Sequence, residues 1–420
     1  MDKLIIEGGK KLNGLVQISG AKNAALPILA ATLLTDELCV IKNVPNLRDV
    51  QTMVKILRSL GVKTQFQDSR VIVEPTKYNN ITADYKLVST MRASICVLGP
   101  LLAKQKLARV SLPGGCVIGP RPIDLHLKGL SGLGAKIKIE HGYVIADGKK
   151  LKGARIYLGG PFGSSVLATA NVIMAATLTP GKTIIENAAC EPEIVDLANF
   201  LVKMGAKIKG QNTHTIEIEG VQKLHGVEHQ IINDRIEAGT YILACAMTKG
   251  EITIKGVCIG HLGALIDKLR DVGVVIKNIG DAIHVKSSKR LKPVDITTLP
   301  FPGFPTDLQA QMMALMSVSS GISVITEKIY PERFMHISEL SRMGAQIMKE
   351  GSSAIIKGTA KLSGAPVMAS DLRASASLVL AALVAQGKTE ISRVYHLDRG
   401  YEKMEEKLSG LGAKIWREKE

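Results

Sequence analysis

Aromatic residues are scarce in this sequence. One Trp, 8 Tyr and 6 Phe make up only 4% of its 420 residues. Proteins that bind single-stranded nucleic acids stack the bases on such side chains. The low aromatic content therefore argues against a nucleic-acid partner, although it does not by itself remove that class.

Long apolar runs are also lacking. The longest, Ala24–Leu34 and Ser377–Ala385, are shorter than the roughly 18 residues that a membrane-spanning helix needs. The first residues, MDKL, have neither the basic nor the apolar region of an export signal. We therefore expect a soluble, cytoplasmic protein with no membrane partner, and a chain of this length is expected to form two or three cores.

The chain has six cysteines but no C-x-x-C pair, which argues against a disulfide framework and a structural zinc site. Four stand in apolar segments and are expected to be small buried side chains: Cys39, Cys96, Cys245 and Cys258. Three histidines lack the spacing of metal ligands and are expected on helix surfaces or in support of neighbouring residues: His126, His336 and His396. No metal and no cofactor are predicted.

Acidic residues are outnumbered by basic ones. The chain has 54 Lys and Arg against 38 Asp and Glu, which gives a formal net charge of +16 and a pI near 9.5. Such an excess favours an anionic partner, either a nucleic acid or an anionic metabolite.

The sequence repeats itself six times. A hydrophobic residue, a glycine and a strand-like segment recur at spacings of 73, 71, 68, 71 and 68 residues: Gly61, Gly134, Gly205, Gly273, Gly344 and Gly412. Each glycine follows a helical pattern, such as residues 50–60 or 193–204, where a left-handed C-terminal cap favours a residue without Cβ. Six units of about 70 residues account for the whole chain.

A second feature lies about forty residues before each of these glycines: a strand-like segment followed by a helix that is apolar on nearly all sides. Such a helix is buried, so each unit should supply one core helix and one amphipathic outer helix against a small sheet. Three units per domain predict an α+β protein with two domains, residues 22–230 and residues 1–21 with 231–420. The strand at residues 3–7 is expected to pair with the C-terminal half, and the strand at 225–233 to lead into the fourth unit.

Polar residues gather at the first turn of each core helix: Lys22, Asn23, Arg92, Ser164, Ser165, Asp234, Arg235, Asp307 and Arg373. Helix N-termini carry unpaired N–H groups and a partial positive charge, so several of them facing one interdomain cleft would bind an anion. In the alternative interpretation, the charges only solvate helix ends and adjacent residues are plain N-caps. Those candidate caps are Ser89, Thr90, Asn233, Thr306 and Ser370.

The second unit carries an insertion, residues 112–126, with the sequence LPGGCVIGPRPIDLH. Its glycines and prolines predict a mobile loop that would serve as a lid. Cys116 follows two glycines and lies five residues before Arg121. This setting lowers the pKa of a thiol and leaves it accessible. A nucleophile and a general acid are both open roles for Cys116.

Seven motifs carry a resemblance that runs over the whole chain: SGAKNAALPILAATLL, PGGCVIGPRPIDLH, IENAACEPEIVDLANFL, FPTDLQAQ, ERFMHISELSRMGA, DLRASASLVLAAL and YHLDRGYE. In this order they resemble the UDP-N-acetylglucosamine enolpyruvyl transferase family. The resemblance implies two similar inside-out α/β domains, each of three βαβαββ-like repeats, that close over a cleft. It also implies transfer of the enolpyruvyl group of phosphoenolpyruvate to the 3′-hydroxyl of UDP-N-acetylglucosamine, by addition and elimination, as the first committed step of peptidoglycan synthesis.

The resemblance also assigns roles to individual residues. Cys116 would protonate C3 of phosphoenolpyruvate and would be the residue that fosfomycin alkylates, and Asp307 would take the proton of the sugar hydroxyl. The anionic ends of phosphoenolpyruvate would be held by basic residues: the phosphate by Lys22, Arg121 and Arg399, and the carboxylate by Arg373 and Arg399.

Contacts with the nucleotide sugar are implied for a larger set: Asn23, Arg92, Arg121, Pro122, Ile123, Asp124, Leu125, Gly163, Ser164, Ser165, Val166, Asp307 and Ile329. Glycine-rich backbone and helix N-termini suit a pyrophosphate. Leu167 departs from the family, whose members usually have glycine there. We therefore expect the backbone at 163–166 to approach the diphosphate differently.

Three other interpretations remain open. A sister enzyme that uses shikimate 3-phosphate shares the fold and the first substrate, although Cys116 and the RPIDLH segment favour the nucleotide sugar. A basic RNA binder would use repeats related to those of RNA 3′-phosphate cyclases. A weakly active paralogue would retain the pocket without efficient turnover.

Overall fold

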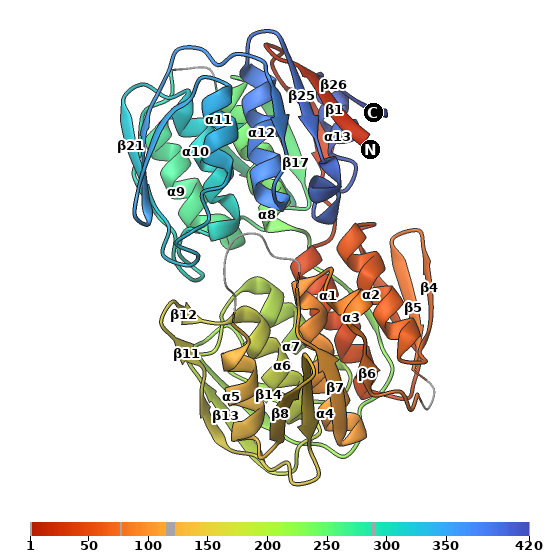
Figure 1. The fold of residues 1–420 in the computed structure, drawn as a ribbon. Helices are drawn as coiled ribbons and strands as arrows, with labels where there is room; N and C mark the ends of the chain where they lie inside the picture. The colour runs from red at the N-terminus through yellow and green to blue at the C-terminus, as the bar shows by residue number, and fades with distance from the viewer. Residues whose placement is uncertain (1, 76–77, 115–121, 288–289, 420) are drawn as a thin grey trace. The chain divides into compact units, whose positions relative to one another are not determined.

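A computed structural model describes residues 2–75, 78–114, 122–287 and 290–419. These residues form two compact units (Figure 1). The inserted unit holds the described residues between 20 and 232, and the terminal unit combines those up to 19 with those from 233 onwards. Two residues of the predicted site, Cys116 and Arg121, lie outside the described residues.

Three repeats in succession build the inserted unit. The first holds α1 (Lys22–Ala31), η1 (Thr32–Leu34), β3 (Cys39–Lys42), α2 (Arg48–Ser59), β4 (Lys63–Gln67) and β5 (Arg70–Glu74). The second holds β6 (Thr82–Ala83), α3 (Tyr85–Val88), η2 (Arg92–Val97), α4 (Leu98–Gln105), β7 (Leu107–Ser111), α5 (Asp124–Gly132), β8 (Lys136–Glu140) and β9 (Tyr143–Asp147). The third holds β10 (Arg155–Tyr157), β11 (Gly159–Gly160), β12 (Gly163–Ser164), α6 (Val166–Thr177), β13 (Lys182–Glu186), α7 (Pro192–Lys203), β14 (Lys207–Lys209) and β15 (Thr215–Glu219), and β16 (Glu228–Gln230) follows.

The terminal unit begins with β1 (Asp2–Glu7) and β2 (Asn13–Gln17) and resumes after residue 232. Its fourth repeat holds α8 (Arg235–Met247), β17 (Glu251–Lys255), η3 (Ile259–Leu262), α9 (Gly263–Val272), β18 (Val275–Ile279) and β19 (Ala282–Lys286). The fifth holds β20 (Ile296–Thr297), η4 (Thr306–Leu308), α10 (Gln309–Ser317), β21 (Ile322–Thr326), α11 (His336–Arg342), β22 (Gln346–Glu350) and β23 (Ser353–Lys357). The sixth holds β24 (Pro366–Met368), α12 (Leu372–Val384), β25 (Lys388–Ser392), η5 (Val394–Arg399), α13 (Met404–Gly410) and β26 (Lys414–Lys419).

Among the described residues, each repeat corresponds to one four-stranded sheet with a shared topology. The orders are β16-β3-β5-β4, β6-β7-β9-β8 and β10-β13-β15-β14 in the inserted unit, and β2-β17-β19-β18, β20-β21-β23-β22 and β24-β25-β1-β26 in the terminal unit. In every sheet the first strand runs parallel to the second, as Glu228 beside Val40 or Ile296 beside Ile325 shows. The remaining pairs are antiparallel.

Three strands come from outside the repeat whose sheet they complete. As predicted, β1 pairs with the C-terminal half, between β25 and β26. The strand preceding the first repeat, β2, lies beside β17 of the fourth repeat, and β16, which precedes the fourth repeat, lies beside β3 of the first. The strand predicted at 225–233 does precede the fourth unit, but the prediction was incomplete, because β16 pairs with β3 of the first repeat. There it takes the edge position that β2 takes beside β17 in the fourth repeat.

Helices occupy the centre of each unit and sheets the outside. In α8 every residue from Ile236 to Met247 is buried, and α8 packs against α10 and α12. Strands such as β5 and β23 alternate buried and more exposed residues. An all-round apolar helix has to be covered on every side, whereas an alternating strand needs cover on one face only. The inside-out arrangement follows from these two patterns.

The repeated glycines end the amphipathic helices as predicted. All six have positive φ: Gly61 +95°, Gly134 +91°, Gly205 +101°, Gly273 +102°, Gly344 +92° and Gly412 +92°. The helices expected at residues 50–60 and 193–204 are α2 and α7, each displaced by one or two residues. Left-handed backbone is costly for residues with a Cβ, so each repeat keeps glycine where the chain turns into the next strand.

Burial of the cysteines differs from the prediction at one position. Cys39, Cys96 and Cys245 are buried, and burial raises the pKa of Cys39 to about 11 and those of Cys96 and Cys245 to about 12. Cys258 is exposed, because Val257 turns into the core and the next residue faces outward. In the described part of the chain, no helix is long and apolar enough to cross a membrane.

Two glycines at the end of α13 allow a matched test of the left-handed cap. A Cβ on Gly412 would meet only Lys11 O at 3.9 Å, and one on Gly410 would meet nothing within 4 Å, so packing distinguishes them little. We expect Gly412→Ala to lower the free energy of unfolding by about 1–2 kcal/mol, because its φ is left-handed. Gly410→Ala, within the helix, should leave it unchanged or raise it by up to about 1 kcal/mol. Urea unfolding of both variants checks this, and equal effects would contradict it.

Candidate active site

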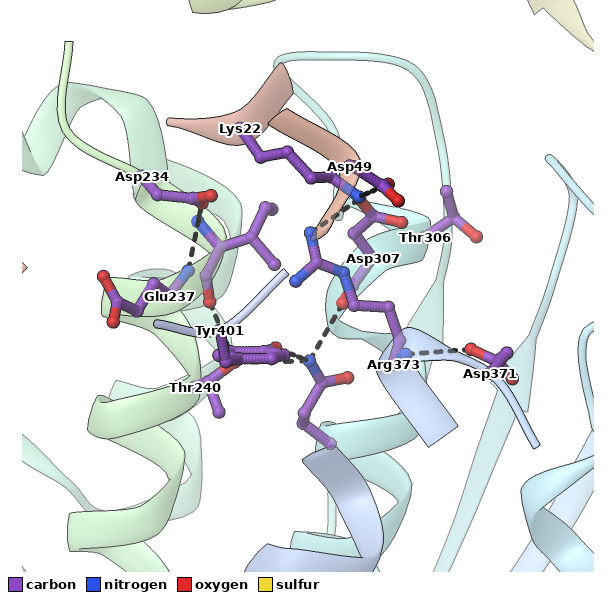
Figure 2. A network of polar contacts seen from close by, with 12 residues as sticks. Lys22, Asp49, Asp234, Glu237, Thr240, Thr306, Asp307, Asp371, Arg373 and Tyr401 are labelled. Carbon is purple, nitrogen blue, oxygen red and sulfur yellow. Dashed lines mark hydrogen bonds and ion pairs between the residues drawn. The ribbon is translucent and has the colours of Figure 1, made fainter. Parts of the chain in front are cut away.

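Asp307 forms ion pairs with two arginines that come from distant segments, and Figure 2 shows one of them, Arg373. Its Oδ1 accepts a hydrogen bond from Arg333 Nη1 at 2.8 Å, and its Oδ2 accepts one from Arg373 Nη2 at 3.1 Å. The Asp307 side chain is 27% exposed, whereas those of Arg333 and Arg373 are 7% and 1% exposed. Buried cations therefore fix a carboxylate that remains accessible to a ligand.

Arg373 stands in the first turn of α12, where a positive charge opposes the helix dipole. Asp371 caps this helix, because its Oδ1 accepts the N–H groups of Arg373 and Ala374 at 2.8 and 3.1 Å. Burial alone would lower the pKa of Arg373, but Tyr401 and Asp307 raise it above its ordinary value. The guanidinium lies 5.3 Å from the centre of the Tyr401 ring. Arg373 is thus a buried, permanently charged group.

Further donors of Arg373 are available for a ligand. Its Nε and Nη1 are buried and have no hydrogen-bond partner among the described residues. A buried donor that stays unpaired costs about 1–3 kcal/mol. Guanidinium groups bind carboxylates and phosphates at two points. Arg373 thus has two buried donors that could bind an anion beside Asp307.

A buried polar layer beneath Asp307 joins several elements. Gln311 Nε2 lies 3.0 Å from the main-chain oxygen of Asp307, 3.0 Å from the Tyr401 hydroxyl and 3.2 Å from Thr240 Oγ1. The hydroxyls of Thr240 and Tyr401 are 2.9 Å apart (Figure 2). Connected networks of this kind hold their members rigidly. They tie η4, which carries Asp307, to α8 and to the segment after η5.

In the inserted unit, Lys22 begins α1 and pairs with Asp49 of α2. Lys22 Nζ lies 3.1 Å from Asp49 Oδ2, and the two side chains are 10% and 6% exposed. Asn23, the next residue, is half-buried. A buried ion pair gains little net stability once desolvation is counted. Its effect here is to hold an ammonium group at the N-terminus of α1.

Arg92 holds the C-terminal part of the 112–126 segment, from Pro122 onwards. Its Nη2 donates to the main-chain oxygen of Pro122 at 2.9 Å, directly before α5. Of the residues that follow, Ile123 is buried, Asp124 is exposed and Leu125 is half-buried. The structure thus brings Arg92 together with the segment that leads into α5.

His126 is buried and supports neighbouring residues, which is one of the two placements predicted for it. Asn171 Oδ1 accepts the N–H of Gly99 at 2.8 Å, so its Nδ2 must donate to the Ile95 oxygen and to His126 Nδ1, at 2.9 and 2.8 Å. The bond to Nδ1 requires that nitrogen to be unprotonated. Burial, assisted by the charge of Arg92, lowers the pKa of His126 to about 3. A neutral histidine thus links α5 to α6 and η2.

His336 is likewise buried, at the start of α11, and burial lowers its pKa to about 4. His126 follows the half-buried Leu125 and His336 follows the exposed Met335, so the preceding residue does not distinguish these buried positions from the helix surface. His396 is half-buried in η5.

The segment before α6 has the form expected of an anion site. Gly163 has a φ of +94°, and Gly163 and Ser164 form β12 opposite β11. Ser165 caps α6, because its Oγ accepts the N–H of Ala168 at 3.4 Å. Val166 and Leu167 are half-buried and pack against the core of the inserted unit.

Two further predicted residues belong to the terminal unit. The N–H of Ile329 donates to Glu327 Oε1 at 2.8 Å, and Arg399 is the half-buried last residue of η5. The N-caps expected at Ser89, Thr90, Asn233, Thr306 and Ser370 are wrong, since side chains of Asp234 and Asp371 cap α8 and α12 and the remaining helix starts have other residues at the cap position. In both caps one carboxylate oxygen accepts two helix N–H groups, and its negative charge is favourable at a helix N-terminus.

Sequence reasoning missed several residues that shape this site: Asp49, Glu327, Arg333 and Asp371. Arg333 stands in the ERFMHISELSRMGA motif, which carried a resemblance but no role. Its contact with Asp307 spans 26 residues of chain. The residues around Arg333 do not indicate that its side chain is buried. The motif was therefore the signal in the sequence that pointed to this segment.

The fold is that of the class of enolpyruvyl transferases. A family model described as EPSP synthase (3-phosphoshikimate 1-carboxyvinyltransferase) matches residues 6–408. The crystal structure of the enolpyruvyl transferase NikO from Streptomyces tendae superposes with a TM-score of 0.90 at 25% identity, covering 99% of this chain and 98% of that one. EPSP synthase from Acinetobacter baumannii, at 18% identity and a TM-score of 0.77 over the full length of both chains, shares the fold.

Relatives of much higher identity specify the family. The chain is 57% identical over 420 residues to the UDP-N-acetylglucosamine 1-carboxyvinyltransferase of Geobacter metallireducens, covering 100% of both proteins. It is 56% identical over 417 residues to the enzyme of the same name from Methylacidiphilum infernorum, covering 99% of both. The chain therefore belongs to the family of UDP-N-acetylglucosamine 1-carboxyvinyltransferases.

The buried His126 predicts a dependence of stability on pH. Its folded pKa of about 3 lies below the ordinary histidine pKa of 6.5, so between these two pH values the unfolded chain binds the proton and the folded chain does not. Stability should therefore fall as the pH drops from 6.5 towards 3, by up to about 1.4 kcal/mol per pH unit from this residue. In His126→Asn, whose amide oxygen can replace Nδ1 as acceptor, urea unfolding should show a shallower fall.

The same substitution at His141, an exposed turn residue, controls for the loss of a histidine. Equal slopes for the wild type and His126→Asn would contradict the role of a buried neutral imidazole.

Proposed function

We propose that the chain transfers the enolpyruvyl group of phosphoenolpyruvate to the 3′-hydroxyl of UDP-N-acetylglucosamine with release of phosphate, as its relatives' names indicate for them. The observation that best supports a role for this site is the carboxylate of Asp307, fixed by Arg333 and Arg373 yet partly exposed. A base of this kind has to keep one orientation while its substrate arrives.

The reaction consists of an addition and an elimination. The sugar O3′ attacks C2 of phosphoenolpyruvate while its proton passes to Asp307, and C3 takes a proton from Cys116. The tetrahedral adduct then loses phosphate from C2 and a proton from C3, which restores the double bond in the enolpyruvyl ether. C3 is a weak base, so its protonation needs an acid held in place. Cys116 is assigned by its motif, since it lies outside the described residues.

Basic residues neutralise the charges of phosphoenolpyruvate. Arg373 offers two buried donors, Nε and Nη1, to the carboxylate of phosphoenolpyruvate. Lys22, held in place by Asp49, supplies a point charge for the phosphate, together with Arg121 and Arg399. Such fixed positive groups stabilise the charge that shifts towards phosphate as the adduct collapses.

The nucleotide part is assigned to the inserted unit. Residues 163–166 present main-chain N–H groups at the start of α6, which suits a diphosphate. Pro122 to Leu125, tied to Arg92, offer the adjoining contacts. The half-buried Leu167 packs inward from the helix start, so a Cβ at this position is compatible with the fold.

This activity places the protein at the first committed step of peptidoglycan synthesis, and hence in cell-wall formation, cell shape and division. The proposal includes a cytoplasmic location, fosfomycin as a covalent inhibitor at Cys116, and neither nucleic acid nor membrane as a partner. The scarcity of aromatic residues supports the exclusion of nucleic acid.

Release of inorganic phosphate tests the proposed reaction. We expect release from phosphoenolpyruvate with UDP-N-acetylglucosamine and none with shikimate 3-phosphate in its place, because the site includes elements for a nucleotide diphosphate. The reverse preference would select the sister reaction. Steeply salt-dependent RNA binding without any turnover would favour the basic RNA binder instead.

The role of Cys116 predicts a graded series. Cys116→Ala should abolish phosphate release because no acid remains, Cys116→Asp should retain part of it, and fosfomycin should inactivate the wild type but not Cys116→Asp. The exposed Cys258 supplies the control, since Cys258→Ala should keep both activity and fosfomycin sensitivity. Normal turnover by Cys116→Ala would contradict the assignment.

A further inference from the structure

Glu327 is a fully buried carboxylate at the end of β21, with 0% exposure. The parallel strands β20 and β21 end side by side, which places Thr298 level with Glu327. Glu327 is not one of the predicted site residues. Its hydrogen bonds run to Thr298, Thr306 and the turn after β21. A carboxylate only accepts hydrogen bonds, so its surroundings have to supply donors.

One oxygen of Glu327 organises the chain after β21. Glu327 Oε1 accepts the N–H groups of Ile329 and Tyr330 at 2.8 and 2.9 Å. It also accepts the hydroxyl of Thr298 at 2.7 Å, and the same hydroxyl accepts the N–H of Lys328 at 2.9 Å. This oxygen therefore fixes the turn that carries Ile329, a residue of the proposed nucleotide-sugar site.

The other oxygen is linked to the candidate base. Glu327 Oε2 accepts the hydroxyl of Thr306 at 2.9 Å, and Thr306 Oγ1 accepts Arg333 Nη1 at 3.0 Å. The same nitrogen donates to Asp307 at 2.8 Å. Because a guanidinium only donates and a carboxylate only accepts, the hydroxyl of Thr306 has one possible direction. Figure 2 shows Thr306 adjacent to Asp307 in the chain.

We propose that Glu327 is a positioning residue for the reaction, one that sets the candidate base Asp307 through Thr306 and Arg333 and sets the Ile329 turn through its other oxygen. This role rests on the proposed function. It explains why one buried carboxylate gathers donors from three chain segments that meet at the site: the ends of β20 and β21 and the start of η4.

Two isosteric variants separate the two halves of this arrangement. Thr306→Val and Thr298→Val each remove one hydroxyl from Glu327, on opposite oxygens. We expect Thr306→Val to lower kcat about 10- to 100-fold with little change in the KM for UDP-N-acetylglucosamine, because the base loses its alignment. Thr306→Ser should restore most of kcat. Thr298→Val should chiefly raise the KM for UDP-N-acetylglucosamine.

A purely structural carboxylate would respond differently. It predicts that the two Val variants lose thermal stability and activity in parallel, with no division between kcat and KM and no rescue by Thr306→Ser. That outcome, or a normal kcat in Thr306→Val, overturns the proposal while the wild type still turns over. Absence of wild-type turnover overturns the proposed function and, with it, this role. Glu327→Gln, which cannot accept on both sides, should combine both kinetic effects.

Discussion

A helix that is buried on every side has its polar groups confined to its ends. In α8 and α12 the buried run begins within the first turn, so charged residues stand where unpaired N–H groups also point. At the start of α12, Asp371 accepts the unpaired N–H groups and also places a negative charge beside the buried Arg373. The same constraint applies in other repeats, and Lys22, Asp307 and Arg373 stand at such helix starts.

Positive charge at a helix start is unfavourable unless something compensates it. Around Arg373 the compensation comes from Asp307 and from the ring of Tyr401, and further hydrogen-bonding capacity remains on the guanidinium. Lys22 is compensated by Asp49 in the same way. Local charge balance thus leaves each cation fixed in place, and the formal net charge of +16 is largely a property of the rest of the chain.

Local patterns were enough to predict the repeats, because glycine at a left-handed cap and all-round apolar helices each have a distinct sequence signal. The positions of Asp307 and Arg373 at helix starts followed from the same patterns. The partners of these residues did not, since Arg333 and Glu327 reach Thr306 across long stretches of chain. The sequence also did not predict that β2 completes the sheet of the fourth repeat and β16 that of the first, because by pattern alone both strands fit either sheet. Cys116 and Arg121 rest on their motif.

The placement of β1 and β2 has a consequence for the order of folding. The two strands precede the inserted unit in the chain, yet their neighbours β17, β25 and β26 all follow it. The inserted unit, by contrast, has all its strands within one continuous stretch. On the ribosome the inserted unit can be completed first, while β2 stays unpaired until β17 emerges and β1 until β25 and β26 emerge.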